Sequence, residues 1–339
     1  MTTLDEVTTT ADPGFPDFAA LPHLVHADDP VWAPESDEAV AWAFAESAVG
    51  RTPLWAVVAR DGGAPVARAA AFAPVDGVGT VGLLACLPNH REAGVAVLRA
   101  CEHHLASLGA TTVRAPASDP LTVGLQTGGF ELPQTVLTPH NPPWYLDLLE
   151  TAGYGITMRM VAPLMTRRHA PRFLTARAPG VVVRSSDPDR MAEDLGRYLA
   201  VHRVLFSPLA GLPPRAPADS ARLFERLLPV VDPALVVLAE VDGDVVGAIL
   251  CLPDAWQHLP GGRVDRARIV TIGVRPGLQR RRIGLAMGTH LMGVLLRGGY
   301  RSVEGVWVRE ENTAPRALAR RFGAQDGRRF ALLEKSLLS

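Results

Sequence analysis

Lysine is nearly absent from this 339-residue sequence: Lys335 is the only one, and arginine carries the rest of the positive charge. We interpret this bias, together with the abundance of glycine and proline, as a property of a GC-rich genome rather than of the function. The formal net charge is -1. A chain with so little net charge has no overall field that attracts nucleic acid or a membrane surface, so we expect neither as a partner.

Cysteine is also scarce, since the chain has only Cys86, Cys101 and Cys251, and no two of them form a Cys-x-x-Cys pair. This spacing argues against a disulfide framework and a zinc site, and we expect no bound metal. No apolar run approaches the roughly 20 residues that cross a bilayer. Residues 1–17 lack the basic and apolar regions of a secretory signal, so a cytoplasmic protein is the expectation.

The rest of the composition is that of a globular protein, because 47% of the residues are apolar. The length suffices for two domains, each with its own core. Both halves follow one order of expected elements: a hairpin, a strand, a loop, a long helix, a short strand, a helix and a strand. The hairpin tips are Asp61-Gly62 and Asp242-Gly243. A repeat of this length predicts a duplicated α/β domain rather than a solenoid.

Composition also suggests where the domains begin and end. Residues 1–34 are rich in proline and aspartate without periodicity, and we expect an extended or disordered lead-in there. The first domain is expected over residues 35–165. A polar linker with four arginines and two prolines follows over residues 166–179, and the second domain is expected over residues 180–339.

The stretch from Val274 to Ala286 gives the strongest indication of function. An apolar run at 268–274 predicts a strand, and the basic loop after it leads into a predicted helix that reaches about Arg297. Backbone N–H groups in the first turn of a helix lack intrahelical partners, and the helix dipole there favours an anion. The layout predicts a phosphate-binding site. The equivalent loop of the first half, 86–94, has no glycine pair and little basic charge, and we expect no phosphate site there.

The second half, roughly residues 181–338, resembles the GCN5-related N-acetyltransferase (GNAT) superfamily. The matching positions are Ile272-Gly273-Val274-Arg275-Pro276, Gln279, Gly284, Ala286, Asn312 and Gly323. The first half is similar only in the order of its elements, so the whole chain resembles a tandem GNAT protein with a degenerate N-terminal domain. The fold implied is α/β (α+β): two GNAT-like domains, each a mixed, mostly antiparallel central sheet flanked by helices, with a splayed strand pair.

The resemblance implies a donor, acetyl-CoA or another acyl-CoA, bound between the strands at 268–274 and 302–308. Main-chain groups of Ile272, Gly273 and Val274 would pair with its pantetheine arm as an added strand does. A glycine inside the strand fits a bulge or a close backbone approach. Asn312 would cap the next helix and contact the cofactor. The residues expected to hold the pyrophosphate are Gln279, Arg280, Arg281, Arg282, Ile283, Gly284 and Leu285.

Two positions depart from the family pattern. When Gln279 is aligned with the first polar residue of the loop, Arg282 stands where a glycine is expected. Either Arg282 disables the phosphate site, or it keeps a helical φ, retains its N–H and adds a guanidinium near phosphate. A register that starts at Arg281 restores the glycine pattern but moves the loop away from Pro276. Ala319 stands where many members have a tyrosine as general acid, so another group or water would protonate the leaving thiolate.

Glu304 is the candidate general base. Its side chain is expected on the same face of its strand as Val306 and Val308, and burial among apolar neighbours would raise its pKa into a useful range. The alternative is a partly exposed acid at a strand end, paired with Arg301 or Arg309.

The expected function is acyl-CoA-dependent N-acyl transfer, in the first place N-acetyl transfer, by direct attack of a primary amine on the thioester. The acceptor would be a small molecule or a peptide. Two alternatives stay open. One is a biosynthetic acyltransferase whose donor is carried by an acyl carrier protein, an acidic partner that would suit the arginine cluster 280–282. The other is a GNAT-like binding or scaffold protein without activity.

Overall fold

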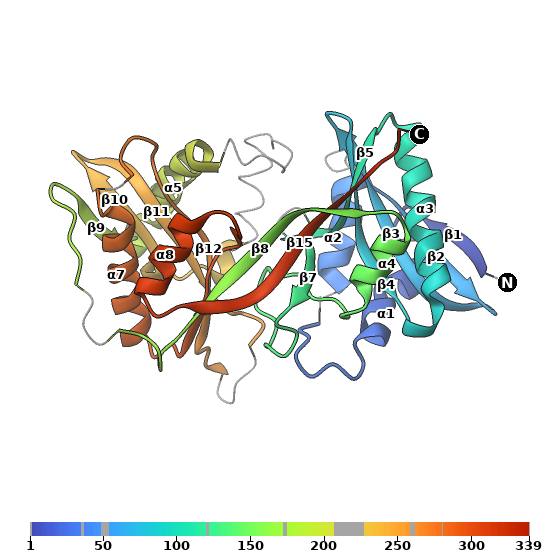
Figure 1. Cartoon of the computed structure of the whole chain (residues 1–339), viewed down its shortest axis with the longest axis horizontal. Coiled ribbons are helices and arrows are strands. Elements are labelled where there is room, and N and C mark those ends of the chain that lie inside the picture. Colours follow the sequence, from blue (N-terminus) through green and yellow to red (C-terminus); the bar gives the residue numbers. More distant parts are fainter. Residues whose placement is uncertain are drawn as a thin grey trace. The chain divides into compact units, whose positions relative to one another are not determined.

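A computed structural model describes residues 2–34, 37–48, 54–119, 122–171, 175–206, 227–257, 262–279 and 281–338. The chain forms two compact units. The first contains Met1–Met160 together with Arg328–Ser339, and the second contains Val161–Gly327. In each unit helices flank a mostly antiparallel sheet (Figure 1). The predicted fold class is confirmed.

The first unit is built around a sheet with the strand order β1-β2-β3-β4-β5-β15, in which β4 and β5 are the parallel pair and β15 is the strand Gln325–Ser336 near the end of the sequence. Its elements are β1 (Thr2–Val7), α1 (Phe15–Val25), α2 (Asp37–Ala48), β2 (Leu54–Asp61), β3 (Ala64–Val75), β4 (Val78–Cys86), α3 (Arg91–Ser107), β5 (Thr112–Asp119), β6 (Thr122–Val123), β7 (Leu125–Gly128), α4 (Tyr145–Thr151) and the first part of β8 (Gly155–Thr166).

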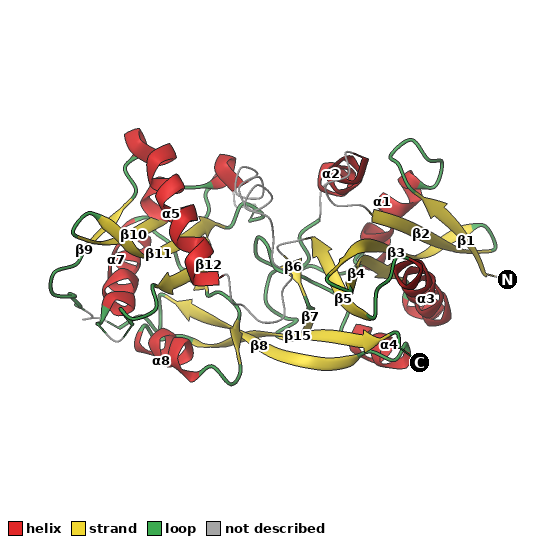
Figure 2. Ribbon diagram, turned by 90° about the horizontal axis from the view of Figure 1, so that it is seen from above, coloured by secondary structure: helices red, strands yellow, loops and turns green. Residues whose placement is uncertain are grey.

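Helices cover both faces of this sheet, with α1 and α2 on one side and α3 and α4 on the other (Figure 2). Side chains of a strand alternate between the two faces. In β2, Val57 and Ala59 therefore join the core beneath α3, whereas Ala56 and Val58 join the core beneath α1 and α2. Both faces of the strand are buried, which explains its continuous apolar run.

Residues 1–34 differ from the expected lead-in, because they contain β1 and α1. Val7 of β1 and Phe18 and Leu21 of α1 are fully buried. They pack with Phe44 of α2 in a core of their own. The proline and aspartate residues that suggested an irregular segment lie mostly in turns or in the first turn of α1, where proline is tolerated.

The second unit has the strand order β8-β13-β12-β11-β10-β9, in which β12 and β13 are parallel. Its elements are the end of β8, β9 (Val182–Ser185), α5 (Met191–Phe206), β10 (Val236–Val241), β11 (Asp244–Pro253), β12 (Arg266–Val274), α7 (Ile283–Arg297), β13 (Ser302–Glu304), β14 (Val308–Arg309), α8 (Thr313–Arg321) and the start of β15 (Gln325–Ser336).

Helix α5 lies on one face of this sheet, and α7 and α8 lie on the other (Figures 1 and 2). The apolar stripe of α7, with Ile283, Met287 and Leu291, packs on Ile249 and Ile269 of the sheet. Its spacing of four residues is that of one helix face.

Within the described part of the chain, no helix combines the length and apolarity needed to cross a membrane.

The units do not meet at the expected linker, because β8 passes from the first unit to the second at residues 160 and 161. β15 passes back at residues 327 and 328. In the described part of residues 166–179, Ala176 and Ala178 pack against the core of the second unit. This segment therefore belongs to the second unit rather than forming a separate spacer.

Candidate functional site

Strands β12 and β13 run side by side over three residue pairs and then separate. The pairs are Arg266 with Ser302, Ala267 with Val303, and Arg268 with Glu304. β12 continues to Val274, and along residues 269–274 the described strands pair with it only on the opposite edge, through β11. Among the described residues, no strand pairs with the β13 side of this stretch. This is the splayed pair expected from the sequence.

A β-bulge interrupts β12 close to the point of separation. Leu250 of β11 pairs with Thr271 and Cys251 pairs with Ile269, so Val270 is the additional residue. Gly273 pairs regularly with Ala248, so of the two alternatives expected there, a bulge or a close backbone approach, the bulge lies at Val270 instead. A bulge changes the direction in which a strand presents its backbone groups, and here it stands just beyond the last β12–β13 pair.

The loop after β12 turns the chain into the N-terminus of α7. The amide of Arg275 donates to the carbonyl oxygen of Val246 at 2.8 Å, and Gly277 takes a positive φ of 84° in the turn that follows. The amide of Ala286 donates to Arg282 at 2.9 Å as the first helical hydrogen bond. The N–H groups of Ile283, Gly284 and Leu285 precede that bond, so the helix itself provides no acceptor for them.

Arg282 is the N-cap of α7, and its φ of 62° lies in the left-handed region. The expectation that Arg282 keeps a right-handed helical φ is wrong. The chain requires here the conformation that glycine adopts without strain. The arginine is exposed and its side chain forms no capping hydrogen bond.

The other residues expected around the phosphate differ in what they present. Gln279 and Arg281 are exposed, whereas Arg280 lies outside the described residues. Ile283 and Leu285 bury their side chains in the core, so only their main chain is accessible to a ligand. A Cβ atom on Gly284 would lie 3.4 Å from Leu318, an ordinary van der Waals distance, so the packing of α8 against α7 does not itself require glycine there.

Asn312 is the N-cap of α8, as expected, but its side chain makes no capping hydrogen bond. Its backbone N–H donates to the carbonyl of Arg309 at 3.0 Å. The side chain is exposed. The expected side-chain capping is therefore not present.

Glu304 occupies the last paired position of β13, where the two strands begin to separate. It is buried, with 3% of its surface exposed, and its register partner Arg268 is 4% exposed. The Arg268 guanidinium lies 5.2 Å from the centre of the Trp307 ring. Arg301, an alternative partner for Glu304, instead pairs with Asp265 at 3.3 Å. Glu304 is thus a buried acid at the vertex of the splay rather than a partly exposed one.

The sequence did not indicate a second polar pair on β12. The hydroxyl of Tyr198 on α5 lies 2.6 Å from that of Thr271, one residue beyond the bulge, and both side chains are buried. Burial raises the pKa of Tyr198, so its hydroxyl keeps its proton near neutral pH. The two residues are far apart in the chain, and no local spacing could have linked them.

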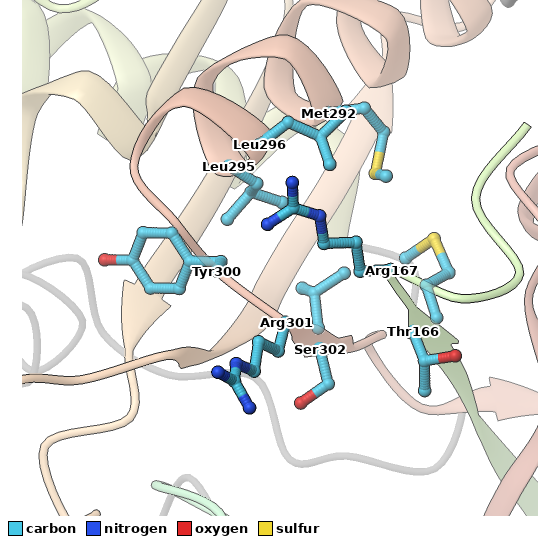
Figure 3. Close-up of a pocket in the computed structure, with 10 residues that line it drawn as sticks. Thr166, Arg167, Met292, Leu295, Leu296, Tyr300, Arg301 and Ser302 are labelled. Carbon is cyan, nitrogen blue, oxygen red and sulfur yellow. The ribbon is translucent and has the colours of Figure 1, made fainter. Parts of the chain in front are cut away.

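A shallow pocket lies at the opposite end of α7, near its C-terminus (Figure 3). Met292, Leu295 and Leu296 of the helix form one wall, and Tyr300 and Arg167 also line it. None of the residues predicted to bind the donor lines this pocket. The candidate site is therefore the divergence of β12 and β13 together with the first turn of α7.

Comparisons with known proteins point to one family. Residues 204–324 match the model described as "Acetyltransferase (GNAT) family". The chain is 26% identical to Bacterial ceramide synthase of Caulobacter vibrioides (strain NA1000 / CB15N), with 94% of both chains covered. It is 24% identical to Protein YghO of Escherichia coli (strain K12), with 94% of this chain and 92% of the relative covered.

Among solved structures, the fold is similar to a tandem GNAT protein from the clavulanic acid biosynthesis pathway. The TM-score is 0.67 and the identity 17%, with 99% of this chain and 98% of the other covered. At this identity the likeness concerns the fold, and it extends over both units. Together these findings identify a domain of the GNAT acetyltransferase family at residues 204–324 and the fold of a tandem GNAT protein over both units.

Proposed function

We propose that the second unit transfers an acyl group from an acyl-CoA to a primary amine. The observation that carries this proposal is the separation of β12 from β13 after Arg268 and Glu304, which leaves one edge of β12 open. An extended pantetheine arm carries amide groups along its length, and it can add to such an edge by strand-like hydrogen bonds. The N–H groups at the start of α7, with the dipole of a 15-residue helix behind them, suit the pyrophosphate at the other end of the arm.

The reaction follows from this placement of the donor. Glu304, as the proposed general base, takes a proton from the incoming ammonium, and the free amine nitrogen then attacks the thioester carbon. Main-chain N–H groups on the open edge of β12 stabilise the negative charge on the carbonyl oxygen. When the C–S bond breaks, the thiolate of CoA leaves and takes a proton, and the amide remains with the acceptor.

The first unit is proposed to have no donor site, and three features support this. β4 and β5 pair as far as Gly82 and Ala117, beyond the extent of the β12–β13 pairing. The hydroxyl of Tyr145 lies 2.7 Å from the amide nitrogen and 3.2 Å from the carbonyl oxygen of Cys86, at the end of β4. Glu92 in the first turn of α3 would also repel phosphate.

The name of the Caulobacter relative suggests the chemical class of the acceptor. A ceramide is an amide formed between a long-chain amino alcohol and a fatty acid, so the name implies N-acyl transfer. The alignment with this relative covers 94% of both chains. We therefore propose an amino alcohol with a long alkyl chain as the first acceptor to test. The same reasoning favours a long-chain acyl donor over acetyl.

Calorimetric titration of the full chain with acetyl-CoA, a long-chain acyl-CoA and an acylated carrier protein tests the proposal. Saturable binding of an acyl-CoA, followed by amide formation with an amino alcohol, supports it. Binding of the carrier protein alone would shift the donor to that class, for which the exposed Arg281 and Arg282 provide complementary charge. If none of the three binds, the chain is a non-catalytic member of the superfamily and the proposal is wrong.

A further inference from the structure

Three polar side chains converge in the first unit, away from the proposed acyl-transfer site. They are His26 at the end of α1, Asp29 in the turn that follows, and His140 in the segment between β7 and α4. Their potential ligand atoms all lie within 4.8 Å of one another. Two imidazoles and a carboxylate at this separation form the kind of donor set that holds a divalent transition metal.

The hydrogen bonds around His140 determine which of its nitrogens faces Asp29. The side-chain nitrogen of Gln126 donates to the carbonyl oxygens of Gly128 and Gly129, at 3.4 and 3.1 Å. This orientation turns the Gln126 oxygen toward Nδ1 of His140 at 3.2 Å. An amide oxygen only accepts, so Nδ1 carries the proton. In the neutral imidazole Nε2 then has a lone pair, and it points at the Asp29 carboxylate.

We propose that His26, Asp29 and His140 form a binding site for a divalent transition metal ion, with zinc as the best match. Nδ1 of His26, Oδ2 of Asp29 and Nε2 of His140 would be the ligand atoms. Three protein ligands of this kind leave a fourth position for water or another ligand. The hydrogen bond from Nδ1 of His140 to Gln126 would act as the outer-shell contact that metal-bound histidines usually have.

The distances are close to those that a metal ion requires. With metal–ligand bonds of about 2.0–2.2 Å, neighbouring atoms of a tetrahedral site lie about 3.3–3.5 Å apart. Nδ1 of His26 is 3.4 Å from Oδ2 of Asp29. Nε2 of His140 is 2.7 Å from the same oxygen, so this pair would have to separate slightly. Asp29 is 26% exposed, which leaves the ion a route from solvent.

The surrounding contacts hold the ligands in place before any ion binds. The His26 ring stacks on Trp32 with a centroid distance of 4.8 Å. Oδ1 of Asp29 accepts the amide of Val31 at 3.1 Å, which directs Oδ2 toward the two imidazoles. The amide of Gln134 donates to the carbonyl of Val31 at 2.8 Å and joins the two segments that carry the ligands. Because the ligand side chains are already ordered, they lose less conformational entropy when the ion binds.

The competing explanation is a hydrogen-bond network without metal, in which a protonated His140 pairs with Asp29. Zinc titration of the full chain, purified without a metal-affinity tag, distinguishes the two. We expect one equivalent of zinc to bind and raise the melting temperature of the protein. The variants His26→Gln, Asp29→Asn and His140→Gln should each weaken zinc binding at least about tenfold. The matched control is His103→Gln, at an exposed histidine on α3, and it should bind like the wild type.

X-ray absorption of the zinc-loaded wild type gives a readout that does not depend on the folding of any variant. We expect scattering from two imidazoles and from oxygen ligands, without sulfur. Sulfur in the coordination shell would assign the ion to a cysteine and overturn the proposal. A wild type that binds no stoichiometric zinc, or binding that persists in all three variants, would do the same.

Discussion

Arg282 combines a left-handed backbone with a bulky side chain immediately before α7. A non-glycine residue in this region carries strain of roughly 1–3 kcal/mol. We therefore expect Arg282→Gly to raise the free energy of unfolding of the second unit by about 1 kcal/mol, measured by denaturant titration. Arg281→Gly is the control, because the φ of Arg281 is not left-handed. That change should be neutral or destabilising, and equal gains in both variants would contradict the strain argument.

Glu304 lies at the vertex of the strand separation, where a base would meet the incoming amine. Replacement by glutamine keeps its shape and removes its ability to accept a proton. We expect Glu304→Gln to lower kcat by about 10²–10⁴-fold while the affinity for acyl-CoA, measured by calorimetry, stays unchanged. Glu311→Gln, at an exposed acid beside α8, is the control. An unaltered rate in Glu304→Gln would assign the role of base to another group.

Two features require glycine at position 323: a close backbone contact and a positive φ of 79°. A Cβ atom there would overlap the carbonyl oxygen of His169. Gly299 has the same φ of 79°, but nothing lies within 4 Å of its Cβ position. We expect Gly299→Ala to reduce stability by about 1 kcal/mol and Gly323→Ala by at least about 3 kcal/mol, in thermal or denaturant unfolding. Similar losses would mean that the contact with His169 relaxes without cost.

At the scale of elements, a charged cluster joins α5 to the edge of the second sheet. The two terminal nitrogens of the Arg184 guanidinium, Nη1 and Nη2, donate to the buried Asp194, each at 2.7 Å. Glu240 of β10 accepts hydrogen bonds from Arg184 and Arg197. The hydrogen bonds from Arg184 lower the pKa of Asp194 from 3.8 to about 2. The folded state therefore favours the charged carboxylate.

This pKa has a consequence for stability in acid. Because the folded value lies below the unfolded one, the contribution of Asp194 is complete above about pH 4 and is lost as the pH falls toward 2, and it amounts to about 2 kcal/mol. We expect Asp194→Asn to flatten the decline of stability in this range, followed by unfolding at a series of pH values. The exposed Asp189→Asn should leave the decline as it is. A wild-type slope in Asp194→Asn would contradict the assignment.

Elements with a local signal were predicted well. The tip Asp242-Gly243 forms a two-residue turn with φ values of 49° and 86°, as an Asp-Gly pair predicts. In the first hairpin the turn residues are Gly62 and Gly63, within the expected turn Asp61-Gly62-Gly63. The strand 268–274 and the start of α7 were also predicted, because an apolar run and a helical stripe are visible in a single stretch of sequence.

What the sequence could not provide depends on contacts between distant segments. Phe18 and Phe44 create a core only by meeting across a loop, so α1 was not expected. The pairing of Arg268 with Glu304 is a matter of strand register, which no local pattern specifies. The left-handed φ of Arg282 follows from the path between β12 and α7, since arginine itself does not favour it. The fold was therefore more predictable than the geometry of the site.

At the scale of the whole molecule, the composition of the first unit leads to a test with fragments. Residues 328–339 supply part of its core, including Phe330, Ala331 and Leu333, and β15 pairs with β5 from Leu333 to Ser336. We expect residues 1–160 alone to lack a cooperative unfolding transition in calorimetry. The same fragment joined to residues 328–339 by a flexible linker should regain one.

The control for this fusion is Phe330→Asp, which would bury a charge and should abolish the transition. A cooperative transition in residues 1–160 without the strand would show that β15 is dispensable for the first unit.

The return of β15 to the first unit also bears on how the protein is made. Translation proceeds from the N-terminus, and domains generally fold as they emerge from the ribosome. Here the first unit remains without a sheet strand and several core residues until residues 328–339 have been synthesised. The second unit, Val161–Gly327, is complete earlier. The order of folding is then expected to be the reverse of the order of synthesis, with the N-terminal half partly exposed until β15 has been made.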